Sequence, residues 1–147
     1  MYASKKKPII ISFDGNIGSG KSTIIHYFEQ NFPKFCNLKT HHYKICFLDE
    51  PVNQWESIVD ISDNKNIIEK FYNNNKEYAF QFQMMAYISR LSLLRKALKE
   101  DYDIIFTERS IYTDKNVFAQ MLYDFKKMNN TEFIIYSKWF NEFTDII

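Results

Sequence analysis

The chain has one glycine-rich stretch, Gly15-Asn16-Ile17-Gly18-Ser19-Gly20-Lys21-Ser22, and this stretch contains all three of its glycines. An apolar run at residues 9–13 precedes it, and helix-like residues 23–28 follow it. Between a strand and a helix, the pattern G-x-x-x-x-G-K-[ST] indicates phosphate binding. Glycines let backbone N–H groups turn inward around an anion, and the positive N-terminal end of the following helix faces the same anion. The stretch therefore predicts a site for a nucleoside triphosphate.

Two side chains of this stretch have separate expected roles. Lys21 would reach the β- and γ-phosphates as a catalytic cation, and the Ser22 hydroxyl would ligate Mg²⁺. A chance glycine turn is the alternative, which the confinement of every glycine to one loop disfavours. The residues expected to bind ATP are Gly15, Asn16, Ile17, Gly18, Ser19, Gly20, Lys21, Ser22 and Thr23.

Composition narrows the classes of protein that fit. With 147 residues, 46% of them hydrophobic and 18% aromatic, the chain can form one domain with a substantial core and is not a disordered polymer. A formal net charge of +1 argues against a surface that coats nucleic acid, and no apolar run approaches the length of a membrane span. We therefore expect small-molecule ligands and neither a nucleic-acid nor a membrane partner. Because the first strand starts by Pro8, we expect no signal peptide.

The two cysteines, Cys36 and Cys46, suit a reducing cytosol. We expect a cytoplasmic protein without a disulfide framework. Cys36 with His41 and His42 could form a metal site, but their spacing matches no standard zinc pattern. Ordinary loop and strand positions are the favoured interpretation of these three residues.

Strand-like and helix-like segments alternate along the chain. Strands are expected at residues 8–13, 42–49 and 103–107. Helices are expected at 20–31 (ending near Pro33), 76–100, 114–128 and 131–144 (capped by Thr131), and a short helix with a mobile loop at 62–75. Strands separated by helices imply a parallel sheet flanked by helical crossovers, which is an α/β P-loop fold.

Polar residues follow each expected strand. The glycine loop follows the first strand, Asp49-Glu50 the second and Glu108-Arg109 the third. In parallel sheets the ligand lies at the carboxyl ends of the strands. Phosphoryl transfer needs an aligned nucleophile and neutralised phosphate charge, which carboxylates and a guanidinium can provide. A plain ion pair is the alternative for Glu108-Arg109, and a surface salt bridge is the alternative for Glu50.

Three further motifs occur in order: Glu50-Pro51-Val52-x-x-Trp55, Phe82-Gln83 and Glu108-Arg109-Ser110-Ile111-Tyr112-x-Asp114. With the glycine loop, they resemble the deoxynucleoside kinase family, which includes deoxycytidine and deoxyguanosine kinases, their insect relatives and mitochondrial-type thymidine kinase. The resemblance runs from about residue 9 to residue 144. It implies a P-loop nucleoside kinase fold. It also implies transfer of the γ-phosphate of ATP, with Mg²⁺, to the 5′-hydroxyl of a deoxynucleoside in nucleotide salvage.

The resemblance also implies roles for individual polar residues. Glu50 is similar to the family's general base, which accepts the proton of the sugar 5′-hydroxyl. Arg109 would hold the attacking hydroxyl and phosphate oxygens through its planar fork. Glu108 is similar to the family's carboxylate on the Mg²⁺ side, where Ser22 is also expected. The expected catalytic residues are thus Glu50, Arg109 and Lys21.

Helix geometry predicts a second group of residues, for the nucleoside. Gln83, Ala86 and Arg90 share one face of the expected long helix, and Asp114 and Phe118 share a face of the next. A glutamine amide can pair with a nucleobase edge in both directions. By resemblance, Phe82 and Phe118 sandwich the base, Trp55 lines the pocket and Tyr72 contacts the 3′-hydroxyl, with core packing as the alternative for the two phenylalanines. The expected substrate-binding residues are Glu50, Trp55, Tyr72, Phe82, Gln83, Ala86, Arg90, Arg109, Asp114 and Phe118.

Base preference depends on Arg90 and Asp114. This charged pair beside the small Ala86 resembles the deoxycytidine/deoxyguanosine branch, whereas the thymidine-accepting branch has uncharged residues there. A buried Asp114–Arg90 pair favours an exocyclic amino group and disfavours the carbonyl and methyl groups of thymine. We therefore expect deoxycytidine, deoxyadenosine or deoxyguanosine to be preferred over thymidine.

The chain departs from the family pattern after its third strand. Family members continue through a fourth and a fifth strand and an arginine-rich lid, so we expect residues 1–147 to be a kinase domain that lacks these parts. The first strand would then have an open apolar edge, Ile9-Ile10-Ile11, and turnover without a lid would be weak. Family members also pair through helices that correspond to about residues 114–144, which implies a homodimer.

Other functions share some of these motifs. A nucleoside monophosphate kinase of the thymidylate type has the same loop and sheet, but its phosphorylated acceptor needs cations where Glu50 stands. A catalytically weak nucleotide-binding fragment with a regulatory role would bind nucleotides without forming product. A P-loop ATPase or GTPase is disfavoured, because no guanine-recognition motif is visible.

Overall fold

The computed structural model describes residues 7–35 and 43–144. The chain divides into two compact units, a sheet unit (Met1–Glu50 and Leu93–Ser110) and a helical unit (Pro51–Ser92 and Ile111–Ile147). The metal site considered for Cys36, His41 and His42 lies outside the described residues. Among the residues that the structure describes, no helix combines the length and apolar character needed to cross a membrane.

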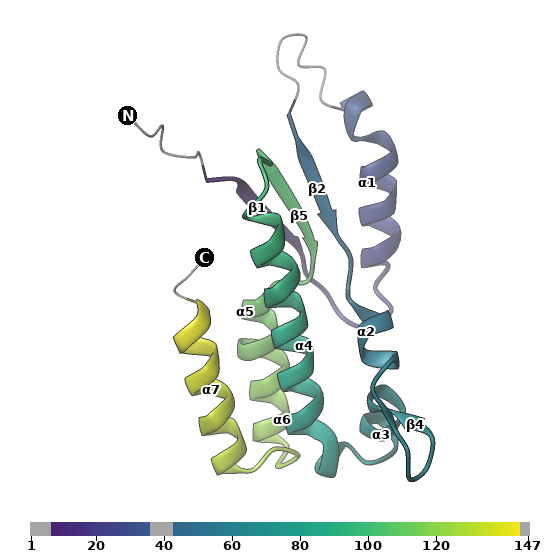
Figure 1. Ribbon diagram of the computed structural model, residues 1–147, viewed down its shortest axis with the longest axis vertical. Coiled ribbons are helices and arrows are strands. Elements are labelled where there is room, and N and C mark those ends of the chain that lie inside the picture. The colour runs from purple at the N-terminus through teal and green to yellow at the C-terminus, as the bar shows by residue number, and fades with distance from the viewer. Residues whose placement is uncertain (1–6, 36–42, 145–147) are drawn as a thin grey trace. The chain divides into compact units, whose positions relative to one another are not determined.

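The sheet unit contains three parallel strands in the order β1-β5-β2 (Figure 1). They are β1 (Ile9–Phe13), β2 (Ile45–Leu48) and β5 (Ile104–Glu108), and helix α1 (Lys21–Phe35) connects the first two. Ile104 of the central strand pairs with Ile9 on one side and Ile45 on the other. The predicted α/β fold with a parallel sheet is confirmed, and its strands shift by only a few residues.

An aromatic cluster forms the core of the sheet unit. Phe106 of β5 is buried; its ring stacks on Phe47 of β2 at 5.0 Å and meets Phe32 of α1 edge-on at 5.4 Å. Phe13 and Phe28 lie 5.5 Å apart and complete the cluster. Burying one such side chain contributes roughly 1.5–3 kcal/mol, so this cluster fixes α1 against the sheet.

Helix α1 ends near Pro33 as predicted, but it runs through the proline to Phe35, four residues beyond the predicted last residue, 31. A proline removes one N–H from the hydrogen-bond ladder, and near the end of a helix that loss does not prevent a further half-turn.

The outer edge of β1 is open, as predicted. Within the described part of the chain, β1 pairs only with β5, and Ile9 and Ile10 of β1 are 60% and 39% exposed. An apolar edge strand presents unpaired backbone groups to any strand that approaches it.

The helical unit is built around the long helix α4 (Asn75–Ala97), whose last residues belong to the sheet unit. Its other elements are α2 (Val52–Glu56), β3 (Val59–Asp60), β4 (Lys65–Asn66), α3 (Ile67–Asn73), α5 (Ile111–Thr113), η1 (Asp114–Ala119), α6 (Gln120–Asp124) and α7 (Asn130–Thr144). Buried residues of α4, α5, η1 and α7 form its main core: Tyr87, Leu91, Ile111, Ala119, Tyr136 and Phe140.

Two predicted segments of the helical unit differ in the structure. Residues 114–128 were expected to form one α-helix, but Asp114–Ala119 form a π-helical segment and α6 ends at Asp124. Such segments arise where tertiary packing overrides local helix propensity, and they are frequent at functional sites. In the segment 62–75, the expected short helix is present as α3, and a turn followed by the short strand β4 precedes it where a loop was expected.

The last helix has a different cap from the predicted one. Thr131 lies inside α7, and Asn129 caps it: the Glu132 N–H donates to Asn129 Oδ1 at 3.0 Å, and the Asn129 N–H donates to Glu132 Oε2 at 2.7 Å. This reciprocal capping box satisfies two donors at once, which a threonine two residues further along, inside the helix, does not do.

Candidate active site

The glycine loop lies between β1 and α1, as the sequence predicts. Gly18 and Gly20 have φ angles of +73° and +84°, a left-handed conformation that favours glycine. A side chain at Gly15 would collide with Ser19, because a Cβ atom there would lie 2.9 Å from Ser19 Oγ. The buried Lys21 donates a hydrogen bond from Nζ to the Asn16 carbonyl at 2.9 Å, which holds its ammonium group against the loop. The loop thus has the backbone of an anion site with a cation beside it.

Two residues predicted to ligate Mg²⁺ are in contact in the sheet unit. Ser22 at the start of α1 donates a hydrogen bond from Oγ to Oε1 of Glu108 at 2.8 Å. Glu108 is buried at the carboxyl end of β5. A hydroxyl and a carboxylate oxygen side by side are ligands that Mg²⁺ prefers, so the donor set fits this ion. In the described part of the chain, no group of three or more His, Cys, Asp or Glu residues is arranged to hold a metal.

Arg109 contacts both Glu50, the predicted general base, and the glycine loop. Its Nε lies 3.7 Å from Oε1 of Glu50, and its Nη1 donates a hydrogen bond to the Gly15 carbonyl at 3.1 Å. Arg109 is buried and has a φ angle of +68°, which for a side chain other than glycine costs on the order of 1–3 kcal/mol. Its backbone N–H donates to the Phe13 carbonyl, which stabilises this conformation. Backbone strain of this kind clusters at functional sites, so it favours a functional role for Arg109.

The charged pair predicted for the helical unit is present. Arg90 Nη1 lies 2.6 Å from Asp114 Oδ1, and the two side chains are only 8% and 3% exposed. The Arg90 guanidinium also lies 5.1 Å from the centre of the Trp55 ring. Trp55 in turn donates a hydrogen bond from Nε1 to Ser89 Oγ at 2.9 Å. Arg90, Asp114 and Trp55 therefore form one buried polar network.

Gln83 carries an unsatisfied polar atom. Its side chain is buried, and Oε1 has no hydrogen-bond partner among the described residues. Nearly all buried polar atoms in proteins have a partner, so an orphan acceptor suggests that a ligand supplies the donor. The Tyr136 hydroxyl is also buried, and burial together with the charge of Asp114 raises the pKa of Tyr136 far above its ordinary value.

Only some of the aromatic residues predicted to bind the nucleoside contact one another. Phe82 contacts Trp55 edge-on at 5.5 Å and stacks on Phe71 at 4.6 Å. Phe118 is half-buried on η1, and its sandwich with Phe82 stays a prediction. Tyr72, expected at the sugar, is 65% exposed at the end of α3. Ala86 is buried and packs in the same cluster as Trp55 and Ile67.

The predicted residues therefore form two groups, one within each unit. The glycine loop, Glu50, Glu108 and Arg109 belong to the sheet unit; Trp55, Tyr72, Phe82, Gln83, Ala86, Arg90, Asp114 and Phe118 belong to the helical unit. The sequence model of deoxynucleoside kinases matches residues 11–147. The chain belongs to the deoxynucleoside kinase family.

Individual members of this family are similar to the chain over most of its length. A probable deoxycytidine kinase of Fowlpox virus is 34% identical over 139 residues, which are 92% of this chain and 51% of the relative. Deoxycytidine kinase of Homo sapiens is 30% identical (88% of this chain, 52% of the relative), and mitochondrial deoxyguanosine kinase of Xenopus laevis is 27% identical (88% and 50%). The chain thus spans about half the length of the curated relatives that it matches.

Two polar residues that contact residues of the predicted motifs, one in each unit, were not predicted. Asp14, directly after β1, accepts hydrogen bonds from the Ser110 N–H at 3.1 Å and from Ser12 Oγ at 2.7 Å, and so holds the turn that follows Arg109. Its place between a strand and the first loop glycine could have indicated it. Ser89 orients Trp55, but nothing in the sequence distinguishes it from other helix serines.

Proposed function

We propose that the protein transfers the γ-phosphate of ATP to the 5′-hydroxyl of a deoxynucleoside, with Mg²⁺, and so supplies precursors for DNA synthesis by salvage. The observation that carries this proposal is the cluster at the carboxyl ends of the sheet strands: Ser22 on Glu108 at 2.8 Å, and Arg109 beside Glu50 at 3.7 Å. Membership of the deoxynucleoside kinase family and the similarity to deoxycytidine kinases support it.

On the donor side, the loop N–H groups and the N-terminal end of α1 bind the phosphates, and Lys21 neutralises charge on the β- and γ-phosphates. Ser22 and Glu108 would hold Mg²⁺, which would neutralise the charge that develops on the transferring phosphoryl group. These roles use residues that already contact one another in the sheet unit.

On the acceptor side, Glu50 accepts the proton of the 5′-hydroxyl. Arg109 contacts Glu50 and the loop carbonyl of Gly15 at once, so it can orient the carboxylate and reach phosphate oxygens. Glu50 exchanges part of its contact with Arg109 for the hydroxyl when the nucleoside binds.

We propose that Gln83, Arg90 and Asp114 select the base. The orphan Oε1 of Gln83 can accept a hydrogen bond from an exocyclic amino group, and its amide can donate one in return. The buried Arg90–Asp114 pair beside Ala86 disfavours the carbonyl and methyl groups of thymine. Deoxycytidine, deoxyadenosine or deoxyguanosine is then preferred over thymidine.

The test is a comparison of kcat/KM for the four deoxynucleosides with ATP as donor, with and without unlabelled monophosphates as competitors. The proposal predicts phosphorylation of an amino-bearing base and weak competition by monophosphates. Best use of thymidine would overturn the base assignment. Strong competition by thymidine monophosphate would instead indicate a thymidylate-type kinase.

We further propose that the kinase domain needs strands beyond β1, β2 and β5, and an arginine-bearing lid. The exposed apolar edge of β1 and the doubled length of the relatives support this. Residues 1–147 alone would then be a weak catalyst that binds nucleotides, because a lid arginine stabilises the transferring phosphate. Comparing turnover by residues 1–147 with turnover by a lid-containing extension of the chain tests this.

We also propose that the protein is a homodimer in the cytoplasm. Exposed apolar side chains on η1, α6 and α7, and at the C-terminal end of α6, support pairing through these helices: Val117, Met121, Phe125, Ile134, Ile135 and Trp139. The free thiol of Cys46 suits a reducing compartment. Sedimentation measurements on a Trp139→Glu variant test the dimer, which this charge would dissociate.

A further inference from the structure

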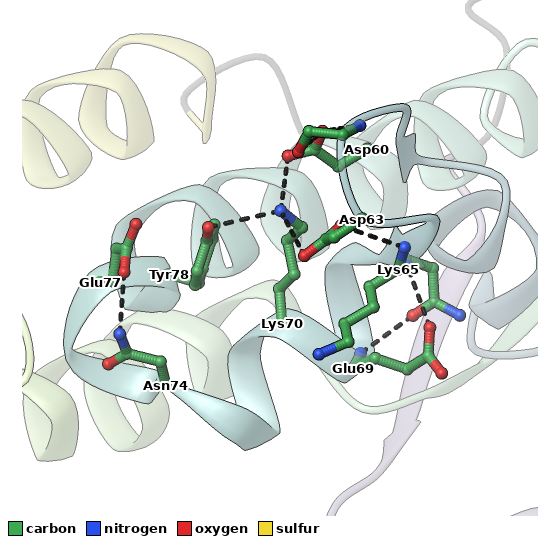
Figure 2. Close-up of polar contacts among 10 residues, drawn as sticks. Asp60, Asp63, Lys65, Glu69, Lys70, Asn74, Glu77 and Tyr78 are labelled. Carbon is green, nitrogen blue, oxygen red and sulfur yellow. Dashed lines mark hydrogen bonds and ion pairs between the residues drawn. The ribbon is translucent and has the colours of Figure 1, made fainter.

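Lys70 is a buried lysine that the proposed chemistry does not use. It lies on α3, and its side chain is 9% exposed. Figure 2 shows it extending from α3 toward Asp60, Asp63 and Tyr78. Its Nζ lies 2.5 Å from Asp60 Oδ2, 3.3 Å from Asp63 Oδ2 and 3.5 Å from the Tyr78 hydroxyl. An ammonium group has three donors, and three oxygens are in reach of them.

The hairpin of β3 and β4 is folded around this ammonium group. The other Asp60 oxygen, Oδ1, accepts hydrogen bonds from the Ser62 N–H at 2.8 Å and the Ser62 hydroxyl at 2.6 Å. Asp63 Oδ1 accepts one from the Lys65 N–H at 3.2 Å. Each carboxylate thus uses one oxygen to shape the turn and the other to bind Lys70. Without the cation, the two carboxylates would repel each other, and the turn would lose its anchor to α3.

Asp60 and Lys70 each stabilise the charged form of the other. The hydrogen bond from Lys70 holds the pKa of Asp60 well below its ordinary value, and the hydrogen bond to Asp60 raises the pKa of Lys70. Both groups are therefore charged across the whole neutral range.

The same hairpin joins the two helices that carry proposed nucleoside contacts. It follows α2, which carries Trp55, and leads into α3, which carries Tyr72 two residues after Lys70. The Ile67 N–H donates to the Ile58 carbonyl at 3.0 Å across its open end. Trp55 and Ile67 also share a buried cluster with Ala86. An interaction that holds the hairpin against α3 therefore also holds α2 in its position next to α3.

We propose that Lys70 is a positioning residue for nucleoside binding: by pinning the Asp60–Asp63 turn to α3, it sets Trp55 and Tyr72 for the base and sugar. This inference rests on the proposed function, since it concerns the nucleoside contacts of the same site. The contacts of Lys70 described above all lie within the helical unit, so its loss is expected to act on nucleoside affinity and not on ATP affinity.

The test compares Lys70→Met with Lys65→Met. Methionine keeps most of the volume of lysine, and the exposed Lys65 lies in the same hairpin, so its variant loses the same charge without loss of the cluster. Equilibrium titration with deoxycytidine and, separately, with ATP gives both affinities. Lys70→Met is expected to weaken deoxycytidine binding roughly tenfold or more, as expected for misplaced contacts. The ATP affinity of Lys70→Met should stay within about twofold of the wild-type value. The deoxycytidine and ATP affinities of Lys65→Met should also stay within about twofold of wild type.

A second measurement separates positioning from simple loss of stability. Hydrogen exchange at a temperature where both proteins are folded should be faster in peptides of α2 and α3 of Lys70→Met, and unchanged in α7. An unchanged deoxycytidine affinity in Lys70→Met, with or without a lower melting temperature, would overturn the proposal. If Lys70→Met does not fold, the Asp63→Asn variant is used in its place, because it removes the carboxylate that lies farther from Lys70. An unchanged deoxycytidine affinity of Asp63→Asn would then overturn the proposal. A wild-type protein that binds ATP but no deoxynucleoside would instead refute the proposed function itself.

Discussion

The buried Arg90–Asp114 pair gives the sharpest stability prediction. The two side chains are 8% and 3% exposed, and their charged atoms are 2.6 Å apart. Removing one member of such a pair leaves a charge in the core and costs about 3–5 kcal/mol. Replacing both with apolar residues of similar volume is close to neutral. We therefore expect Arg90→Met and Asp114→Leu each to destabilise strongly, and the double variant to recover most of the loss.

The assay is thermal and urea unfolding of the four proteins in a double-mutant cycle. A loss of about 3–5 kcal/mol corresponds to a fall in melting temperature of roughly 6–20 °C for a chain of this size. The coupling free energy between the two substitutions should be at least about 3 kcal/mol. Single variants that each cost less than about 1 kcal/mol, or a double variant that costs their sum, would refute the reasoning. The control is Lys115→Met, which removes a cation on η1 that is only partly buried.

Three further predictions test other parts of the structure. Gly20→Ala forces a Cβ atom into a left-handed backbone, at a cost of roughly 1–2 kcal/mol, so ATP affinity measured by titration should fall. The control is Gln30→Ala, an exposed position further along α1, whose ATP affinity should change little. Ser22→Ala removes the partner of Glu108, and the Mg²⁺ concentration needed for half-maximal ATP binding should rise roughly tenfold; an unchanged requirement would remove Ser22 from the metal site. Because the pKa of Asp60 is lowered on folding, its contribution to stability is present above the ordinary carboxyl range and is lost as the pH falls through and below it. The stability difference between wild type and Asp60→Asn should thus be constant at neutral pH and shrink below about pH 4; a difference that grows in acid would contradict this.

Local sequence patterns allowed us to predict much of the proposed ATP-binding part of the protein. The glycine loop needs only neighbouring residues to specify its shape, and the ends of parallel strands always meet at one edge, which brought Glu108 to Ser22. The Arg90–Asp114 pair could be predicted from helix spacing combined with the family resemblance. The predicted Thr131 cap was wrong, although the spacing of Asn129 and Glu132 could have indicated the capping box.

Features that depend on distant contacts could not be read from the sequence. The left-handed backbone of Arg109 is stabilised by a hydrogen bond to β1, which lies far away in the chain. The π-helical turn at Asp114–Ala119 reflects packing and not propensity. The hairpin beside Lys70 looked like a polar loop, because its order comes from two carboxylates that meet a lysine from another element.

The central claim is that Glu50 is the base that activates the nucleoside hydroxyl. The most direct measurement is the rate of phosphoryl transfer in a single turnover by Glu50→Gln, with Asp49→Asn as the matched control for the neighbouring exposed carboxylate. We predict that Glu50→Gln binds ATP and deoxycytidine within about twofold of wild type but transfers phosphate roughly 10²–10⁴-fold more slowly, while Asp49→Asn is unaffected. A Glu50→Gln protein that transfers phosphate at the wild-type rate would contradict the account.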